Sequence, residues 1–407
     1  MEQEKKSVGI ITMHRVINYG SALQTYATVK TVEKLGFLPT VIDYDYPTSY
    51  HIKYAPVRTN PPNSTMIKKI VKQFLRLIGL LPLVMKIRDN RLPYYSIRIH
   101  SFKHFIKQLK ISKPYNIKSI QETPPEFDIY MTGSDQTWNP YFLHHDYSFL
   151  LNFAPKAAPK ISYAASFGGA EFPTEYSEEY GKLLACYDRI SVRESSGKRL
   201  VYNLCGRNAV HVIDPTLLLN RAEWEKLLTD IPIQNNKFIF CYCLISYYSP
   251  APEIFLLLDH LRTLTNYDVY FFSEVPELNQ IAIQYGFRLV CPAGPENFIS
   301  YISYATFIVT TSFHGSAFSV NFNKNFYAIL NPVAFRDDRI KNFLTSIGME
   351  SRGLNLKKTD ISRINVTDLK IDYRECNQKL EKLRKYSLDY LSEALDFASQ
   401  KCATKDE

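Results

Sequence analysis

Short β-rich runs alternate with longer stretches of helical periodicity along almost the whole chain. This alternation is typical of βα units, whose strands form parallel sheets covered by helices. A first series of strands is expected at residues 8–13, 39–44, 128–133, 161–167, 189–194 and 209–214. A second series is expected at residues 237–245, 268–273, 287–290, 305–312 and 325–330. The sequence therefore predicts an α/β protein with two doubly wound, Rossmann-like lobes.

The length of 407 residues is about right for two domains of ordinary size. We expect an N-terminal lobe at residues 1–220 and a C-terminal lobe at residues 221–372. A helical stretch between them begins near Asn220, which has Glu223 at the spacing of a capping box. Residues 373–407 are expected to form a long amphipathic terminal helix.

One face of this terminal helix is expected to be apolar and to pack on the rest of the protein. The residues of that face are Cys376, Leu380, Leu383, Tyr390, Leu391, Ala394 and Phe397. On the outer side, Glu375 and Lys379 are expected to form one ion pair, and Glu381 and Lys385 another, because each pair is four residues apart.

The composition excludes several classes of protein. Apolar residues make up 45% and aromatic residues 14% of the chain, which is too much buriable surface for a mainly disordered protein. The longest apolar stretch, residues 77–85, is far shorter than the roughly 20 residues that span a membrane. The first residues lack an apolar signal core, and the seven cysteines fit no zinc module, so we expect a cytoplasmic protein. Cys241 and Cys243 are expected to share one buried face of a strand.

Positive charge is concentrated in one segment. The formal net charge is +9, but residues 66–110 hold eleven Lys or Arg residues and one acid, so the rest of the chain sums to −1. Residues 66–78 have the pattern of a basic amphipathic helix. Such a helical insert, at about residues 50–115, either packs on the N-terminal lobe or contacts an anionic membrane surface. Nucleic acid is not an expected partner, because the nearby aromatic residues are not interleaved as a stacking platform.

Ligands of open α/β sheets bind beyond the carboxyl ends of the strands, so the turns there are the candidate sites. In the first turn, Gly20 allows a tight bend, and Ser21 begins a helix whose N–H groups can face an anion or a sugar hydroxyl. The candidate acceptor-binding residues of this turn are Asn18, Tyr19, Gly20, Ser21 and Gln24. A second glycine at dinucleotide-binding spacing is lacking, and a plain helix cap explains the turn equally well.

The second turn, residues 133–139, crowds polar side chains and a tryptophan after one glycine. Asp135 is suited to donate a proton or to accept a hydroxyl hydrogen, and Trp138 to stack on a sugar ring. The other candidate acceptor-binding residues of this turn are Ser134, Gln136 and Asn139. Ordinary polar turn chemistry is the alternative.

Two further strand ends carry cationic candidates. His314 stands beside the expected start of a helix at Gly315 or Ser316, which is a suitable cradle for phosphate. Arg193 ends another expected strand, and its planar guanidinium can clamp a carboxylate or phosphate. A structural role for His314, and an ion pair of Arg193 with Glu194 or Asp188, are the alternatives.

Asp43 and Asp45 match the metal-holding D-x-D pattern of some glycosyltransferases. No cluster of histidines or carboxylates supports them, so no metal site is predicted.

Six segments in this order resemble the polysaccharide pyruvyl transferase family. They lie at residues 18–24 (NYGSALQ), 133–139 (GSDQTWN), 162–168 (SYAASFG), 191–194 (SVRE), 214–219 (DPTLLL) and 312–319 (SFHGSAFS). The resemblance covers residues 8 to about 350. It is least constrained in residues 46–115 and in the terminal helix.

The resemblance implies a glycosyltransferase-B-like fold, with an acceptor-binding N-terminal lobe, a donor-binding C-terminal lobe and a cleft between them. It implies phosphoenolpyruvate as the donor, without a further cofactor. The implied acceptor is a hexose of a bacterial surface or capsular glycan, often lipid-linked, so the protein would work at the inner face of the cytoplasmic membrane.

The resemblance also assigns roles to residues of the third turn and its neighbours. Arg193 and His314 fall at the donor-binding arginine and histidine of the family, and Asp135 falls where a catalytic acid is expected. The other implied donor-binding residues are Ser312, Gly315, Ser316 and Arg339. Many relatives carry an arginine at the position of Ser312, so another cation, Arg336 or Arg339, must replace it.

The predicted function is transfer of a pyruvyl group from phosphoenolpyruvate to a hexose, which forms a cyclic ketal and releases phosphate. A glycosyltransferase that uses a nucleotide sugar is one alternative, and Glu296 is the only candidate carboxylate for its ribose. A non-catalytic glycan-binding module is the other alternative; loss of the polar segments would have favoured it, and they are present.

Overall fold

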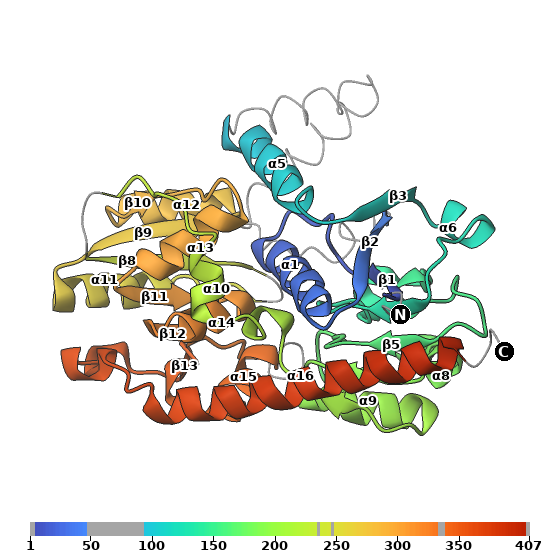
Figure 1. The fold of residues 1–407 in the computed structure, drawn as a ribbon. Coiled ribbons are helices and arrows are strands. Elements are labelled where there is room, and N and C mark those ends of the chain that lie inside the picture. Colours follow the sequence, from blue (N-terminus) through green and yellow to red (C-terminus); the bar gives the residue numbers. More distant parts are fainter. Residues whose placement is uncertain (1–4, 47–92, 234–236, 246–247, 333–337, 404–407) are drawn as a thin grey trace, which may run out of the picture.

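The protein consists of two α/β lobes joined by a long C-terminal helix (Figure 1). The computed structural model describes residues 5–46, 93–233, 237–245, 248–332 and 338–403. The basic helix expected at residues 66–78 lies outside these described residues.

The N-terminal lobe is built on a parallel sheet in the order β3-β2-β1-β4-β5. Its strands are β1 (Ser7–Ile11), β2 (Leu38–Tyr44), β3 (Ile111–Tyr115), β4 (Ile129–Thr132) and β5 (Lys160–Ser162). Two short parallel strands, β6 (Ser191–Val192) and β7 (Val210–His211), continue beside β5 through isolated bridges. Each predicted strand of the first series is therefore present.

Helices and short helical turns cover this sheet. They are α1 (Tyr19–Lys34), α5 (Pro93–Ile106), α6 (Ser119–Glu122), α7 (Pro140–Leu143), η1 (Ser148–Leu150), η2 (Thr174–Tyr176), α8 (Ser177–Ala185), α9 (Ser195–Cys205), η3 (Pro215–Leu217) and α10 (Arg221–Glu225). Asn220 caps α10 and forms the predicted capping box with Glu223.

The C-terminal lobe repeats the same winding in the order β10-β9-β8-β11-β12-β13, with all neighbours parallel. Its strands are β8 (Phe238–Cys243), β9 (Asp268–Ser273), β10 (Arg288–Leu289), β11 (Phe307–Thr310), β12 (Asn325–Ile329) and β13 (Gly353–Leu354). All residues of β8 are buried because helices cover both faces of the sheet, and Cys241 and Cys243 pack in one core cluster as expected.

The helical elements of this lobe are α11 (Glu253–Thr265), α12 (Pro276–Gln284), α13 (Pro295–Tyr304), α14 (Phe313–Asn321), α15 (Arg339–Ile347), η4 (Glu350–Arg352), η5 (Ile361–Arg363) and η6 (Val366–Leu369). Two Rossmann-like lobes with a long terminal helix confirm the glycosyltransferase-B-like fold.

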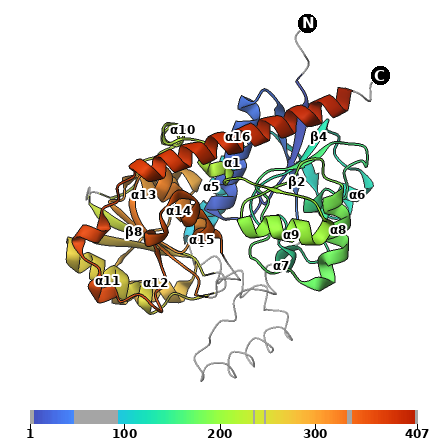
Figure 2. The same ribbon diagram turned by 90° about the horizontal axis from the view of Figure 1, so that it is seen from below.

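The terminal helix α16 (Arg374–Ala403) runs across both lobes (Figure 2). In the C-terminal lobe, Tyr373, just before the helix, donates a hydrogen bond to the carbonyl of Lys324. In the N-terminal lobe, Nε of Arg384 donates a hydrogen bond to the carbonyl of Leu217. The hydroxyl of Tyr390 donates one to the backbone carbonyl of Ser162. The helix therefore fixes the two lobes to each other.

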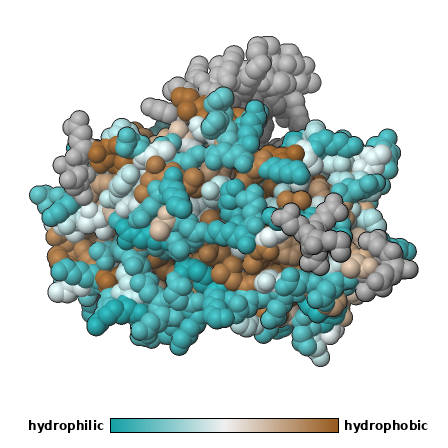
Figure 3. All heavy atoms as spheres, in the orientation of Figure 1, coloured by the Kyte–Doolittle hydropathy of each residue, from teal (hydrophilic) through white to brown (hydrophobic). Residues whose placement is uncertain are grey.

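The outer face of α16 is polar, and hydrophilic residues dominate the lower edge of Figure 3, where this helix runs. The predicted ion pair between Glu375 and Lys379 is present. The second predicted pair is wrong, because Lys385 pairs with Asp389 instead of Glu381. None of the described helices is long and apolar enough to cross a membrane.

The helix α5 and the strand β3 differ from the expected insert at about residues 50–115. The strand β3 pairs with β2 and completes the edge of the N-terminal sheet. In α5, the rings of Phe102 and Phe105 are buried against Tyr19 and Tyr26 of α1. The last third of the basic segment is therefore part of the lobe and not a separate insert.

Candidate active site

The candidate residues gather where strands of both lobes end at their carboxyl termini. The helices α1, α9 and α14 all begin there, following the ends of β1, β6 and β11. The N-terminus of a helix carries partial positive charge and unpaired N–H groups. This meeting point, centred on Arg193 and His314, is called the inter-lobe cluster below.

Gly20 and His314 place the two lobes in direct contact. A Cβ atom on Gly20 would overlap the imidazole ring of His314, so only glycine leaves room for the ring at this position. His314 lies in the first turn of α14 and is 7% exposed. The glycine of the first motif therefore positions the histidine of the last one.

We predict that Gly20→Ala lowers turnover by about 100-fold, because a displacement of the His314 ring by about 1 Å has an effect of this size. Gly36→Ala is the matched control, since no atom lies within 4 Å of its added Cβ and its positive φ costs only stability. Turnover and thermal denaturation of both variants check the prediction. Wild-type turnover in Gly20→Ala would contradict it.

Arg193 is the centre of a buried ionic network. Its Nε donates to Oε1 of Glu194 at 2.9 Å, and its Nη1 donates to Oδ2 of Asp214 at 2.9 Å. Its guanidinium also lies 4.7 Å from the ring centre of Phe313, which belongs to the other lobe. Of the two alternative partners predicted for Arg193, Glu194 forms an ion pair with it, whereas Asp188 pairs with Lys401 instead.

Two nitrogens of this cluster are buried and lack a hydrogen-bond partner among the described residues. They are Nη2 of Arg193 and Nε2 of His314. Nε2 lies 3.5 Å from Oδ2 of Asp214, which is too far for a good hydrogen bond. Because a buried polar atom without a partner is costly, such atoms mark a place where a ligand completes the bonding.

Opposite charges favour the ionised forms of Arg193 and Asp214, whereas burial raises the pKa of Glu194. Burial opposes the charge of Arg193, but Glu194, Asp214 and Asp135 outweigh it and raise the pKa of Arg193. Burial also opposes ionisation of Asp214, but His314, Arg193 and the hydrogen bond from Thr216 hold its pKa well below the ordinary value. Above about pH 5, Asp214 is therefore an anion that binds Arg193 and lies beside His314.

The lowered pKa of Asp214 predicts a pH-dependent contribution to stability. The unfolded chain takes up a proton on this carboxyl near pH 4, where the folded protein still resists protonation. Stability contributed by Asp214 is thus complete above about pH 5 and is lost as the pH falls below it. Denaturant unfolding is measured at a series of pH values. As the pH falls below about 5, the free energy of unfolding should decrease more steeply for wild type than for Asp214→Asn. Parallel curves would contradict this prediction.

Asp135 lies on the N-terminal side of the inter-lobe cluster. Its Oδ2 accepts a hydrogen bond from the Ser21 hydroxyl at 2.5 Å, and its Oδ1 accepts one from the backbone of Gln136. Its backbone φ of 77° is in the left-handed region, a conformation that few residues other than glycine adopt and that occurs at functional sites. The structure thus brings Ser21 of the first turn and Asp135 of the second turn together, near Arg193.

Several candidates for acceptor binding are used by the protein itself. Asn18 caps α1 through the N–H of Ser21, and Gln24 donates to the hydroxyl of Thr12. Ser134 donates to Asp214, and Asn139 donates to the side-chain oxygen of Gln136. These side chains shape the turns, and their contact with an acceptor stays a prediction.

The expectation that Trp138 and Tyr19 contact an acceptor is wrong. The indole of Trp138 is fully buried between Phe167 and Tyr187. Tyr19 is also fully buried, stacks on Phe298 of the other lobe and donates a hydrogen bond to a backbone carbonyl. Both rings are core residues, because the turns that carry them fold inward.

The third turn is organised by Ser312. Its hydroxyl accepts the N–H of Gly315 and so caps α14, and its carbonyl accepts the hydroxyl of Ser316. Arg336 lies outside the described residues. Arg339, at the start of α15, is close enough to act on the pKa of both Arg193 and Glu194.

Asp214 and Glu194 also belong to the inter-lobe cluster, and neither is among the predicted site residues. Both occur within the quoted motifs, and each is the last residue of an expected strand. Asp214 also accepts hydrogen bonds from the N–H and the hydroxyl of Thr216, which is the pattern of an ordinary capped turn. Their position at the end of an expected strand is the signal that could have identified both residues.

Two other acidic candidates have partners away from this cluster. Asp43 accepts hydrogen bonds from Arg15 and contacts Nε2 of His14 at 2.9 Å, and it belongs to no group of metal ligands among the described residues. Glu296, the candidate for ribose, accepts a hydrogen bond from Gln108 beside α5.

Several solved structures are similar to this chain in overall arrangement. A putative UDP-N-acetylglucosamine 2-epimerase from Listeria monocytogenes is 10% identical with a TM-score of 0.47, covering 94% of this chain and 97% of that one. The heptosyltransferase WaaC of E. coli is 13% identical with a TM-score of 0.39, covering 80% and 89%. At these values no property of either protein carries over to this site.

Comparison of the sequence itself is more specific. None of the curated proteins matches the chain. A family model described as polysaccharide pyruvyl transferase matches residues 18–332, a range that contains the inter-lobe cluster and most of both lobes. The chain therefore belongs to the polysaccharide pyruvyl transferase family.

Proposed function

We propose that the protein transfers a pyruvyl group from phosphoenolpyruvate to a hexose of a bacterial surface glycan, forming a cyclic ketal. The observation that carries this proposal is a pair of buried nitrogens, Nη2 of Arg193 and Nε2 of His314, which lack a hydrogen-bond partner among the described residues. They lie on the two lobes and flank the same carboxylate, Asp214. A small anion with a phosphate and a carboxylate would complete their bonding.

The reaction needs an acid for the donor and bases for the acceptor. Protonation of the methylene carbon of phosphoenolpyruvate makes the neighbouring carbon electrophilic. One sugar hydroxyl attacks that carbon, phosphate leaves, and a second hydroxyl of the same sugar closes the ketal. Of the two hydroxyl protons released, one replaces the proton given to the methylene carbon and the other is taken up by phosphate, so the step balances.

The described residues can be assigned to these tasks. Arg193 binds the donor anion with its free guanidinium nitrogen, while Glu194 and Asp214 hold the group in place. His314 binds the phosphate and can deliver a proton to it. Asp135, held by Ser21, is placed to protonate the donor or to accept the acceptor's hydroxyl proton.

Incubation of the purified protein with phosphoenolpyruvate and polyprenyl-diphosphate-linked saccharides tests the proposal. We expect release of phosphate together with an acceptor mass that increases by one pyruvate less one water. The corresponding free saccharides are included, because we propose a lipid-linked acceptor at the membrane surface. Consumption of a nucleotide sugar without consumption of phosphoenolpyruvate would support the glycosyltransferase alternative and reject the proposal.

Arg339 is proposed as the cation that replaces the family arginine at the position of Ser312. We predict that Arg339→Gln raises the KM for phosphoenolpyruvate by about tenfold, the equivalent of one charge-assisted hydrogen bond, with little change in kcat. Arg363→Gln, which removes an exposed arginine paired with Asp360, is the control. Steady-state kinetics check this, and an unchanged KM in Arg339→Gln would assign the role to another residue.

A further inference from the structure

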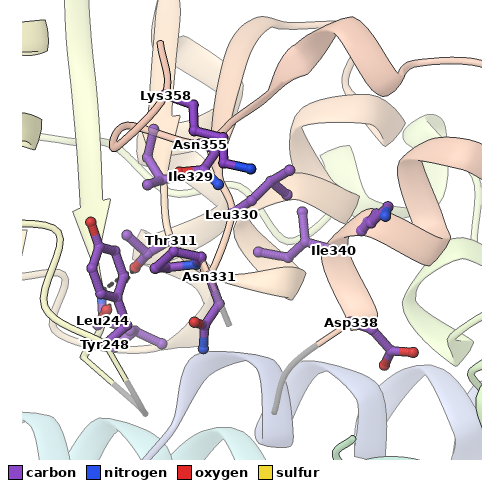
Figure 4. A pocket seen from close by; sticks show the side chains of 12 residues that line it. Leu244, Tyr248, Thr311, Ile329, Leu330, Asn331, Asp338, Ile340, Asn355 and Lys358 are labelled. Carbon is purple, nitrogen blue, oxygen red and sulfur yellow. Dashed lines mark hydrogen bonds between the residues drawn. The ribbon is translucent and has the colours of Figure 1, made fainter. Parts of the chain in front are cut away.

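A cavity of about 260 Å³ lies in the C-terminal lobe, at the carboxyl ends of β8, β11 and β12 (Figure 4). It is called the C-lobe cavity here. Its lining includes Leu244, Tyr248, Thr311, Asn331, Asp338 and Ile340. Neither Arg193 nor His314 belongs to the lining, so this hollow is separate from the inter-lobe cluster.

Two polar atoms of the lining residues are buried without a hydrogen-bond partner among the described residues. They are the hydroxyl oxygen of Tyr248 and Oδ1 of Asp338. The two side chains stand on opposite sides of the cavity, with Thr311 and Asn331 between them (Figure 4). Burying a polar atom without a hydrogen bond costs free energy. A ligand with hydroxyl groups in the cavity would supply the missing hydrogen bonds and offset this cost.

The C-lobe cavity is close to the inter-lobe cluster along the chain and in space. Thr311, which lines the cavity, is three residues before His314. Asp338 and Ile340 line it on either side of Arg339, which acts electrostatically on Arg193. The cavity and the cluster therefore share the helix α15 and the turn before α14.

The lining combines an apolar wall with hydrogen-bonding groups, which suits a sugar ring. Leu244, Ile329 and Ile340 provide the apolar wall, and the Asp338 carboxylate accepts hydrogen bonds from hydroxyl groups. The exposed Lys341 and Lys358 contribute donors. The volume is below the range of about 300–1,000 Å³ for drug-sized ligands, which favours a single ring.

We infer that the C-lobe cavity binds the hexose ring of the acceptor. This inference rests on the proposed function and extends it, because it moves the acceptor from the N-terminal turns to the C-terminal lobe. Asn18 and Asn139 of those turns already bind other parts of the protein, and Gln24 and Trp138, each of which has an atom without a hydrogen-bond partner among the described residues, are fully buried. Tyr248 and Asp338 also have such atoms, and both residues line the cavity.

Saturation-transfer NMR with methyl glycosides of galactose, glucose and mannose tests the inference on the full-length protein. We expect at least one glycoside to bind, with an affinity about tenfold lower in Asp338→Asn and about threefold lower in Tyr248→Phe. Asp372→Asn, whose carboxylate pairs with Arg374 at the surface, and Tyr202→Phe, an exposed residue of α9, are matched controls that should bind as wild type does.

The same samples are titrated with phosphoenolpyruvate. Undiminished glycoside binding in its presence supports separate sites, whereas displacement of the glycoside would overturn the inference, because the cavity would then hold the donor. Absence of binding by every glycoside, or equal binding by Asp338→Asn and wild type, would also overturn it. Glycoside binding that depends on Asp338 in a protein that does not turn over phosphoenolpyruvate supports the cavity and rejects pyruvyl transfer.

Discussion

Replacing Arg193 with lysine is expected to lower kcat/KM for phosphoenolpyruvate by about 100- to 1,000-fold, the effect of losing one well-placed donor to a reacting anion. Lysine keeps a positive charge between Glu194 and Asp214, but it lacks the planar fork whose Nη2 is free for the donor. Steady-state kinetics at varied phosphoenolpyruvate measure the change.

Lysine is preferred to alanine because of the buried carboxylates around Arg193. Removing the charge would take the guanidinium away from two buried carboxylates at a cost of about 3–5 kcal/mol, so loss of activity could reflect unfolding. The control is Arg189→Lys, because Arg189 lies over the ring of Phe397 away from the cluster. A folded Arg193→Lys variant with wild-type kcat/KM would remove Arg193 from donor binding.

Replacing His314 with glutamine is expected to lower kcat by about 100- to 10,000-fold, because glutamine keeps a donor but cannot transfer a proton. Single-turnover measurement of phosphate release separates this chemical step from product release. His260→Gln is the control, since His260 is bonded to the carbonyl of Ile364 in another part of the lobe.

A double variant tests whether the two cations act together. If Arg193 and His314 bind one anion, combining Arg193→Lys with His314→Gln should cost much less than the product of the two single effects. Fully multiplicative losses would instead indicate that the two residues act at independent places.

Strands that are buried on both faces can be predicted from continuous apolar runs. Residues 238–243 are a continuous apolar run because helices cover both sides of β8. The edge strand β3 (Ile111–Tyr115) escapes prediction, because a strand with one free edge can carry Lys113 and Pro114 and lacks an apolar pattern.

The candidate site is predictable in position but not in side-chain detail. The rule that ligands bind beyond strand ends locates Arg193, His314 and Asp135, because it depends only on the winding of the sheet. Whether a turn points its side chains inward depends on packing between distant segments, as in the burial of Trp138 against Phe167. The C-lobe cavity likewise combines residues from 244 to 358 and has no local signature.

A crystal structure with bound phosphoenolpyruvate is the most direct test of the account. The account predicts that the donor lies between the lobes, with one anionic group on Nη2 of Arg193 and another on Nε2 of His314. Binding of the donor in the C-lobe cavity or elsewhere, with both nitrogens still unpartnered, would contradict it.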